Sequence, residues 1–260
     1  MQKSRKEVLI IIPAYNEEKT IGEFLEQLEQ SEIAPYADIL VMNDASKDRT
    51  AEIVKNRNHA VVTHIYNLGY GCGLQISYKY AADKGYQYVI QMDADGQHDA
   101  SNAITIYKRM KTADAQGNYP DIVLGSRFVK GSVGYPTSFV KKVAYTLFRG
   151  MIRLGTGRKI MDPTTGLQGL SRRAFSYYAQ FNHFDDQYPD ANMIMQMILL
   201  GFRVEEIPAL MHVRTEGVSM HSGWKPIIYM FRMMFSIIAV WLRIAVFHVD
   251  VEVVHEGDVS

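Results

Sequence analysis

The sequence predicts an α/β fold in which a mostly parallel β-sheet is flanked by helices. Short apolar runs of strand length recur through the first half of the chain, and helical patterns separate them. This alternation is typical of strand–helix–strand units, whose strands pair in parallel. Several runs, such as VLIII at residues 8–12, are apolar at every position. That pattern favours strands that are covered on both faces.

The expected elements follow one another in a regular order. After the strand at 8–12, apolar side chains recur at helical spacing from Ile21 to Leu28. Further strands are expected in ADILVMND, AVVTHIYN, YQYVIQMDADG and PDIVLGSRF. Helices are expected in ASKDRTAEIVKN and in LGYGCGLQISYKYAADKG, where Gly85 ends the helix.

The second half of the chain has longer helical patterns. TSFVKKVAYTLFRGMIRLGTG predicts a helix with apolar and basic side chains, and DPTTGLQGLSRRAF predicts turns followed by a short helix. YPDANMIMQMILLGFRVEEIPALMHVR predicts a helix that stops at Gly201 and a strand after it. We expect a globular domain over 1–222, an apolar helix over 223–249 and an acidic tail over 250–260.

Composition limits the classes of protein that fit. The 260 residues are 47% hydrophobic and 22% charged, which suits one globular domain with a substantial core. Lys plus Arg and Asp plus Glu number 28 each, so no excess of positive charge points to nucleic acid as a partner. The single cysteine, Cys72, excludes an internal disulfide and fits a cytosolic compartment. The N-terminal apolar run is too short for a signal peptide, because Pro13 and acidic residues interrupt it.

Polar side chains gather where the expected strands end. In an open parallel sheet, ligands bind in the crevice beyond the carboxyl ends of the strands. We therefore expect five clusters to lie together at one edge and to bind a ligand. They are residues 13–17, 43–44, 67–69, 93–95 and 125–127.

The cluster in QMDADGQHDA places Asp93 and Asp95 one residue apart after a strand. Like charges this close need a cation, a proton or solvent to be tolerated. Mg2+ and Mn2+ prefer oxygen ligands, which both carboxylates and the Gln97 amide could supply, while Gly96 permits a tight turn. The alternative is an aspartate-stabilised turn or helix cap without a ligand. Because four other polar clusters lie at the expected strand ends, we favour a cation site over a turn or a helix cap.

Seven motifs occur in order along the chain: IIPAYNEE, VMNDASKDRT, NLGYGCGL, MDADGQHD, LGSRF, DPTTGLQGLSR and RTEGVSMH. In this order they resemble family-2 glycosyltransferases with the GT-A fold, over about residues 7–221. They look most like the polyprenyl-phosphate hexose synthases, the group of dolichyl-phosphate mannose and glucose synthases. The resemblance implies that 1–222 is a glycosyltransferase catalytic domain.

The resemblance also implies where the nucleotide of a sugar donor would bind. The turn after the first strand and Asp44 would hold the base and the ribose. The turn residues are Pro13, Ala14, Tyr15 and Glu17. The chain departs from the usual pattern at three positions: Asn43 stands where a second acid is usual, Tyr70 where Lys is frequent, and Met220 where Lys is common.

The phosphates of the donor and a metal ion would lie further along the same edge. By resemblance, Asp93, Asp95 and Gln97 match the acidic motif that binds the donor diphosphate through Mg2+ or Mn2+. Arg127, Arg214 and Ser219 match positions near the phosphates. His221 would add a metal or diphosphate contact when its loop closes over the donor.

The implied reaction is a metal-dependent, inverting transfer of a hexose or N-acetylhexosamine. We expect a uridine diphosphate sugar as donor and a polyprenyl phosphate, such as undecaprenyl phosphate, as acceptor. A phosphomonoester is largely ionised at neutral pH, so it needs cations for docking and no base. The candidate cations are Arg127, Lys141, Lys142, Arg149 and Arg153.

Other functions stay open at this point. Transfer to a hydroxyl of a lipid-linked glycan, as in capsule, O-antigen or cell-wall polysaccharide synthesis, would need a base, and Asp190 or Asp162 is the candidate. Asp190 could also act only as a negative charge that the dipole of the following helix stabilises. Arg127 could form only a surface salt bridge. In another class of protein, the chain would bind a nucleotide sugar without catalysis or act as a scaffold.

The apolar segment 226–247 has about the length of a bilayer span. Arg232, Ser236 and Arg243 interrupt it and align on one stripe of a helix. Because a charge near the bilayer centre costs at least about 2.5–3.5 kcal/mol, we expect an interfacial helix, or one buried in a homo-oligomer. With the basic helix at 137–155, it would receive a lipid phosphate at the inner face of the cell membrane, with or without a small membrane partner.

Overall fold

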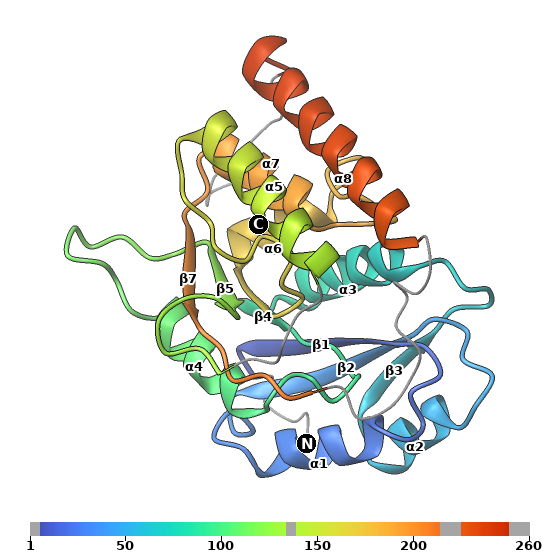
Figure 1. Ribbon diagram of the computed structural model, residues 1–260. Coiled ribbons are helices and arrows are strands. Elements are labelled where there is room, and N and C mark those ends of the chain that lie inside the picture. The colour runs from blue at the N-terminus through green and yellow to red at the C-terminus, as the bar shows by residue number, and fades with distance from the viewer. Residues whose placement is uncertain (1–5, 134–138, 214–224, 250–260) are drawn as a thin grey trace.

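The structure is a computed structural model that describes residues 6–133, 139–213 and 225–249. A seven-stranded sheet in the order β3-β2-β1-β4-β6-β5-β7 runs through the molecule, and helices cover both of its faces (Figure 1). Neighbouring strands are parallel except at β6, which is antiparallel to both β4 and β5. The predicted α/β class with a mostly parallel sheet is therefore confirmed.

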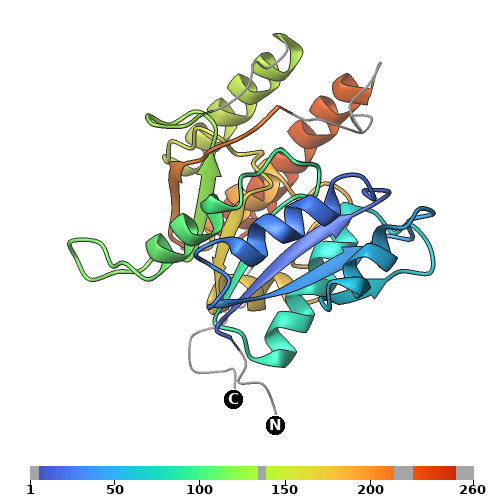
Figure 2. The ribbon, with the colours of Figure 1, turned by 90° about the horizontal axis from the view of Figure 1, so that it is seen from below.

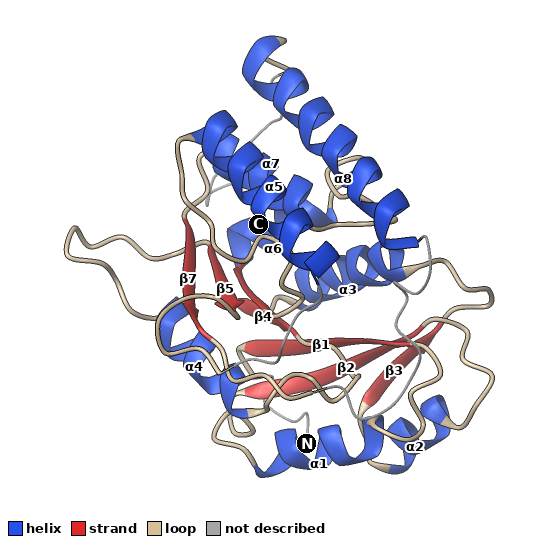
Figure 3. Ribbon diagram, in the orientation of Figure 1, coloured by secondary structure: helices blue, strands red, loops and turns tan. Residues whose placement is uncertain are grey.

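Figure 3 shows strands and helices alternating through the first half of the chain. The strands are β1 Val8–Ala14, β2 Ala37–Asn43, β3 Ala60–Thr63, β4 Tyr88–Gln91, β5 Ile122–Ser126, β6 Gln168–Ser171 and β7 Val204–Pro208. The helices are α1 Ile21–Gln30, α2 Thr50–Asn56, α3 Tyr70–Lys84, α4 Ser101–Met110, α5 Phe139–Thr156, α6 Arg172–Ala179, α7 Ala191–Leu199 and α8 Lys225–Trp241, which continues as the π-helix η1 Leu242–Val246.

The side chains of β1 alternate between two cores, one on each face of the sheet (Figures 1 and 2). Leu9 and Ile11 pack with α3, α5, α6, α7 and α8. Val8, Ile10 and Ile12 pack with α1, α2 and α4. Successive side chains of a strand point to opposite faces, so a strand that is covered on both sides must be apolar at every position. The polar residues that follow each strand lie outside these two cores, at the edge of the sheet.

Strand β6 is the element that the sequence pattern misses. The pattern predicts only turns and a short helix there, but Gln168–Ser171 pairs with β4 and β5 in the middle of the sheet. The strand has only four residues, one of which is glycine, so its apolar signal is weak. A β-carbon on Gly169 would lie 2.2 Å from the Ile106 side chain. Glycine therefore lets α4 pack directly against this strand.

The C-terminal apolar helix forms as predicted, and some of its polar side chains face the protein. Asn192 of α7 donates a hydrogen bond to the Ser236 hydroxyl of α8 (2.8 Å). Arg243 of η1 donates to Oε1 of Gln196, also on α7. Ser236 and Arg243 thus join the C-terminal helix to α7, whereas Arg232 is exposed and its guanidinium lies 4.9 Å from the centre of the Tyr188 ring.

The opposite face of α8 is apolar and exposed, and the helix projects beyond the others in Figure 1. Phe231 is 50% exposed and Phe235 is 64% exposed. Among the described residues, the helix Ile227–Val246 is the one segment long and apolar enough to cross a membrane. The remaining exposed apolar side chains of this region are Ile228, Ile238, Trp241, Leu242, Val246 and Phe247.

Candidate active site

Hydrogen bonds join the loops that follow β1 and β2. The Asn16 amide N–H donates to the Ser46 hydroxyl (2.9 Å), and the Lys47 N–H donates to Oδ1 of Asn16 (2.8 Å). The Glu17 N–H donates to the Thr50 hydroxyl (2.9 Å). The turn predicted to hold the nucleotide is therefore fixed against the next loop of the sheet edge.

The predicted nucleotide-binding side chains of this turn differ in their exposure. Tyr15 is 46% exposed, whereas Ala14 is buried and Pro13 is half-buried. Glu17 accepts a hydrogen bond from the Thr20 hydroxyl (3.0 Å). Tyr15 is thus the one of these four predicted residues with an exposed aromatic ring.

Asp44 connects the second polar cluster with the third. Its Oδ1 accepts the Leu68 N–H (2.7 Å) and lies 2.9 Å from Nδ1 of His64, while its Oδ2 accepts the Gly69 N–H (2.9 Å). Its own N–H donates to the Ala14 carbonyl oxygen (2.9 Å). These bonds bring the ends of three neighbouring strands together, as the sequence predicts.

The acidic loop after β4 is shaped by bonds to its own backbone. The Gln97 N–H donates to Oδ1 of Asp95 (3.0 Å), and Gly96 has a φ of 76°, which glycine adopts without steric cost. The Asp93 N–H donates to Nδ1 of His98 (2.9 Å), so the proton of a neutral ring is on Nε2. Burial lowers the pKa of His98 to about 4, against the opposing charge of Asp95. His98 therefore supports the loop as a neutral ring.

Asp93 is enclosed from two sides. The Tyr70 hydroxyl, at the start of α3, donates to its Oδ1 (3.0 Å). On the other side, a β-carbon on Gly166 would lie 2.4 Å from Oδ2 of Asp93 and 3.2 Å from the Tyr70 hydroxyl. Glycine at this position lets the loop before β6 lie directly against the acid.

The donor set suits a hard cation that keeps part of its shell for water and phosphate. Asp93 and Asp95 are partly exposed, and both offer carboxylate oxygens. No cluster of three or more His, Cys, Asp or Glu side chains placed to hold a metal occurs in the part of the chain that the structure describes. Two carboxylates fit Mg2+ or Mn2+, which commonly bind one or two protein carboxylates and the substrate phosphates.

Arg127 and Asp162 form a buried ion pair behind the acidic loop. Oδ2 of Asp162 accepts both the Arg127 backbone N–H (2.8 Å) and its Nε–H (2.7 Å), and Oδ1 accepts from Nη2 (2.6 Å). Asp162 is fully buried, and its own N–H donates to Glu206 (2.7 Å). Arg127 thus pairs inside the protein, contrary to the surface salt bridge considered from sequence. Because the Asp162 carboxylate is occupied, the geometry favours Asp190 as the candidate base.

Asp190 lies directly before α7 and contacts the C-terminal helix. Its Oδ2 accepts the Tyr229 hydroxyl of α8 (2.6 Å), and its carboxylate makes no capping bond to α7. Burial raises the pKa of Asp190 to about 6; the Tyr229 bond lowers it, and the charge of Asp93 raises it further. A carboxyl group that titrates near neutral pH is suited to proton exchange.

Three predicted site residues, Arg214, Ser219 and His221, lie outside the described residues. The segment that leads to them is fixed to the acidic loop. The His212 N–H donates to the Gln97 carbonyl oxygen (2.8 Å).

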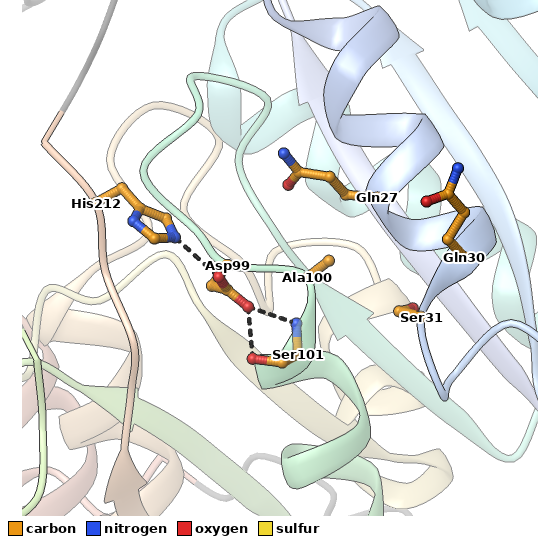
Figure 4. Close-up of a pocket in the computed structure, with 7 residues that line it drawn as sticks. All are labelled: Gln27, Gln30, Ser31, Asp99, Ala100, Ser101 and His212. Atoms are coloured by element: carbon orange, nitrogen blue, oxygen red, sulfur yellow. Dashed lines mark hydrogen bonds and ion pairs between the residues drawn. The ribbon is translucent and has the colours of Figure 1, made fainter.

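A hollow of about 500 Å3 lies next to this connection (Figure 4). Inside it, the carboxylate of Asp99 contacts His212 (2.8 Å) and the Ser101 N–H (2.8 Å). None of the predicted site residues lines this hollow, so it is separate from the cluster around Asp93. Its lining residues are Gln27, Gln30, Ser31, Asp99, Ala100, Ser101 and His212.

Comparison with known proteins decides the family. Residues 9–178 match the family described as glycosyl transferase family 2. The chain belongs to glycosyltransferase family 2. An undecaprenyl-phosphate mannosyltransferase of Micrococcus luteus is 29% identical over 83% of this chain and 88% of its own length. A UDP-N-acetylglucosamine–dolichyl-phosphate N-acetylglucosaminyltransferase of Methanococcus voltae is 27% identical over 67% of this chain and 73% of its own.

Solved structures confirm the predicted GT-A fold of this glycosyltransferase. One is glucosyl-3-phosphoglycerate synthase from Mycobacterium tuberculosis, determined with Mn2+, uridine-diphosphate-glucose and phosphoglyceric acid. It superposes with a TM-score of 0.64 at 16% identity, over 91% of this chain and 80% of that one.

Several contacts of the glycosyltransferase site were not predicted from its sequence. His64 binds Asp44, Glu206 binds the backbone of Asp162, and Tyr229 binds Asp190. The histidine and the glutamate lie far along the chain from their partners, so local patterns carry no sign of them. Tyr229 was the one partner with a sign in the sequence. Its hydroxyl lies in a largely apolar helix, where it needs a hydrogen-bond partner.

Proposed function

We propose that this glycosyltransferase moves a hexose or N-acetylhexosamine from a uridine diphosphate sugar to a polyprenyl phosphate, with inversion and with Mg2+ or Mn2+. One observation carries the proposal. Asp44, Asp93 and Arg127 follow β2, β4 and β5, which run in the same direction, so they lie at one edge of the sheet, and α8 with its exposed apolar face reaches this region through Asp190. The names of the two relatives support a polyprenyl-phosphate acceptor, because one includes undecaprenyl phosphate and the other dolichyl phosphate.

The donor would lie along the fixed loops of this edge. Tyr15 and the turn around it would take the base, and Asp44 the ribose. A cation held by Asp93 and Asp95, with Gln97 and His221 as further predicted ligands, would neutralise the departing diphosphate.

Fixed positive charge would steady the phosphates during the reaction. The ion pair with Asp162 holds the Arg127 guanidinium in one place, so it needs no reorganisation when charge develops. Arg214 and Ser219 would contact the diphosphate from the loop that follows the His212 connection. The acceptor would attack the anomeric carbon from the face opposite the leaving group, which inverts its configuration.

The acceptor phosphate would enter between α5 and α8. The two helices contact each other, since the Phe148 and Tyr229 rings meet edge to face at 6.3 Å. On α5, Lys142 and Arg153 are exposed, and the Arg149 guanidinium lies 4.5 Å from the centre of the Phe128 ring. Basic side chains beside an apolar helix suit a lipid phosphate that arrives from an anionic membrane surface. We therefore place the enzyme in the cytoplasm, peripheral at the inner face of the cell membrane.

A transfer assay tests the proposal. Purified protein is incubated with a panel of nucleotide sugars, undecaprenyl phosphate and Mg2+ or Mn2+, and the lipid product is identified by mass. We expect a glycosyl-phospho-lipid with one donor. Release of nucleotide without a lipid product would move the acceptor to a hydroxyl of a lipid-linked glycan. Release of nucleotide without any acceptor, abolished by Asp95→Ala, would exclude a protein that only binds nucleotide sugars or serves as a scaffold.

The position of Asp190 at the start of α7, bonded to Tyr229 and with its carboxyl pKa raised by burial, favours the hydroxyl alternative. A hydroxyl acceptor needs a base, and Asp190→Asn removes it, so we expect a loss of about 10²-fold or more in that case. With a phosphate acceptor no base is needed, and the same variant should keep most of its activity. A large loss with undecaprenyl phosphate would contradict the proposed mechanism.

A further inference from the structure

A chain of hydrogen bonds runs from the buried Tyr78 to Asp93. The Tyr78 hydroxyl donates to Oε1 of Gln91 (2.8 Å), and Nε2 of Gln91 donates to the Tyr70 hydroxyl oxygen (2.7 Å). The Tyr70 hydroxyl in turn donates to Oδ1 of Asp93 (3.0 Å). Tyr78 is 1% exposed and Gln91 is 3% exposed, so water does not compete for the bond between them, whereas Tyr70 and Asp93 are partly exposed.

The direction of this chain is fixed by its last member. An ionised carboxylate only accepts hydrogen bonds, so the single hydroxyl proton of Tyr70 has to point to Asp93. The Tyr70 oxygen is then an acceptor for the Gln91 amide group. This leaves the Gln91 carbonyl oxygen to accept from Tyr78.

The backbone next to Tyr70 is also held in place. The Cys72 N–H donates to the Asp186 carbonyl oxygen (3.0 Å). A β-carbon on Gly71 would lie 2.4 Å from the Asp185 carbonyl oxygen, so the start of α3 lies directly against the 185–186 backbone. On the far side of the hydroxyl, the loop at Gly166 lies directly against Asp93, since a β-carbon there would come within 2.4 Å of its Oδ2.

We propose that Tyr70 is a positioning residue for the cation site, which fixes Oδ1 of Asp93 so that this carboxylate meets a divalent cation in one orientation. The inference rests on the proposed function, since it deepens the metal site of that reaction. A neutral phenol orients the acid without cancelling its charge, unlike the lysine that is frequent at this position. Partners that hold a metal ligand in place commonly account for about 10–100-fold in metal affinity.

Binding of Mn2+ tests the inference without relying on turnover. Mn2+ is titrated into the full chain in the presence of UDP, and in parallel of GDP, and free Mn2+ is followed by electron paramagnetic resonance. Tyr70→Phe keeps the ring and removes the hydroxyl, and we expect Mn2+ to bind about 10–100-fold more weakly. Tyr80→Phe removes a hydroxyl further along the same helix and serves as the matched control, with binding like that of the wild type. Thermal unfolding confirms that both variants fold.

Asp95→Ala separates the inference from the proposed function. If Asp95→Ala loses Mn2+ binding and Tyr70→Phe does not, the inference is wrong and the metal site stands. If Asp95→Ala binds Mn2+ like the wild type, the metal site and the inference both fail. Should Tyr70→Phe not fold, Gln91→Leu replaces it, since loss of the amide frees the phenol to rotate. We then expect weaker Mn2+ binding by about threefold or more, and unchanged binding would overturn the inference.

Discussion

The hydroxyl of Tyr229 donates a 2.6 Å hydrogen bond to Oδ2 of Asp190. This bond joins the apolar helix α8 to the start of α7, at the candidate base of the site. Two further polar contacts, Asn192 with Ser236 and Gln196 with Arg243, continue along the same pair of helices. The apolar helix is therefore held against α7 by three polar contacts.

Loss of the Tyr229 hydroxyl should raise the pKa of Asp190. A bond that donates to the carboxylate stabilises its charged form, so without it the group keeps its proton to higher pH. In Tyr229→Phe we expect the pKa to move from about 6 to about 7 or higher, since hydrogen bonds to charged groups contribute roughly 1.5–3 kcal/mol. The titration is measured by NMR on protein with 13C-labelled aspartate. The signal of Asp190 is the one that Asp190→Asn removes.

Ser236→Ala is the matched control for this measurement. It also removes one hydroxyl between α8 and α7, but its partner is Asn192 and not Asp190. The pKa of Asp190 should stay near the wild-type value in that variant. An equal rise in both variants would mean that loosening of α8, and not the bond itself, sets the pKa.

Gly166→Ala should disable the site while the fold remains. The added methyl group would lie 2.4 Å from Oδ2 of Asp93, and the carboxylate would have to move. Because a displacement of about 1 Å at a reacting centre can cost about 10²-fold, we expect a loss of that order in donor turnover. Gly150→Ala on α5 is the comparison, since within the described residues no atom outside its own helix and chain neighbours lies within 4 Å of its added carbon. It should gain up to about 1 kcal/mol of stability, as alanine does in a helix interior.

Asp162→Asn should cost stability more than it affects proton transfer. The variant leaves the Arg127 guanidinium, which is 12% exposed, without its negative partner. Breaking a buried pair on one side typically costs about 3–5 kcal/mol, which urea unfolding would show. Asp83→Asn removes an acid that is 72% exposed and should change stability by less than about 0.5 kcal/mol. A variant as stable as the wild type, but inactive, would return Asp162 to the list of candidate bases.

The fold could be predicted wherever burial leaves a pattern in the residues. Strand β1 is covered on both faces, so all of its first five positions, 8–12, have to be apolar, and the pattern identifies it. Strand β6 is equally buried but four residues long, and Gly169 is required there by the Ile106 side chain. A glycine chosen for tertiary contact gives a signal typical of a turn, so this strand could not be found locally.

The site was predictable where chemistry is carried by one stretch of chain. The spacing of Asp93 and Asp95 predicts a cation site, and the strand ends predict that Asp44 lies at the same edge of the sheet. The roles of Asp162 and Asp190 depend on what reaches them from elsewhere. Arg127 occupies one carboxylate and Tyr229 tunes the other, and neither partner is within 30 residues of its acid. The sequence therefore offered two candidates for the base, Asp190 and after it Asp162, and their packing distinguishes them.

The apolar face of α8 should bind the protein to anionic vesicles. Phe231 and Phe235 are 50% and 64% exposed, and burying one such ring in lipid is worth about 1.5–3 kcal/mol. In Phe235→Glu we expect at least about tenfold weaker binding to vesicles of anionic and neutral lipid, measured by co-sedimentation. Tyr119→Glu changes a side chain that is 56% exposed in the loop before β5, and it should bind as the wild type does. Equal binding of all three proteins would mean that the face of α8 meets another protein surface and not lipid.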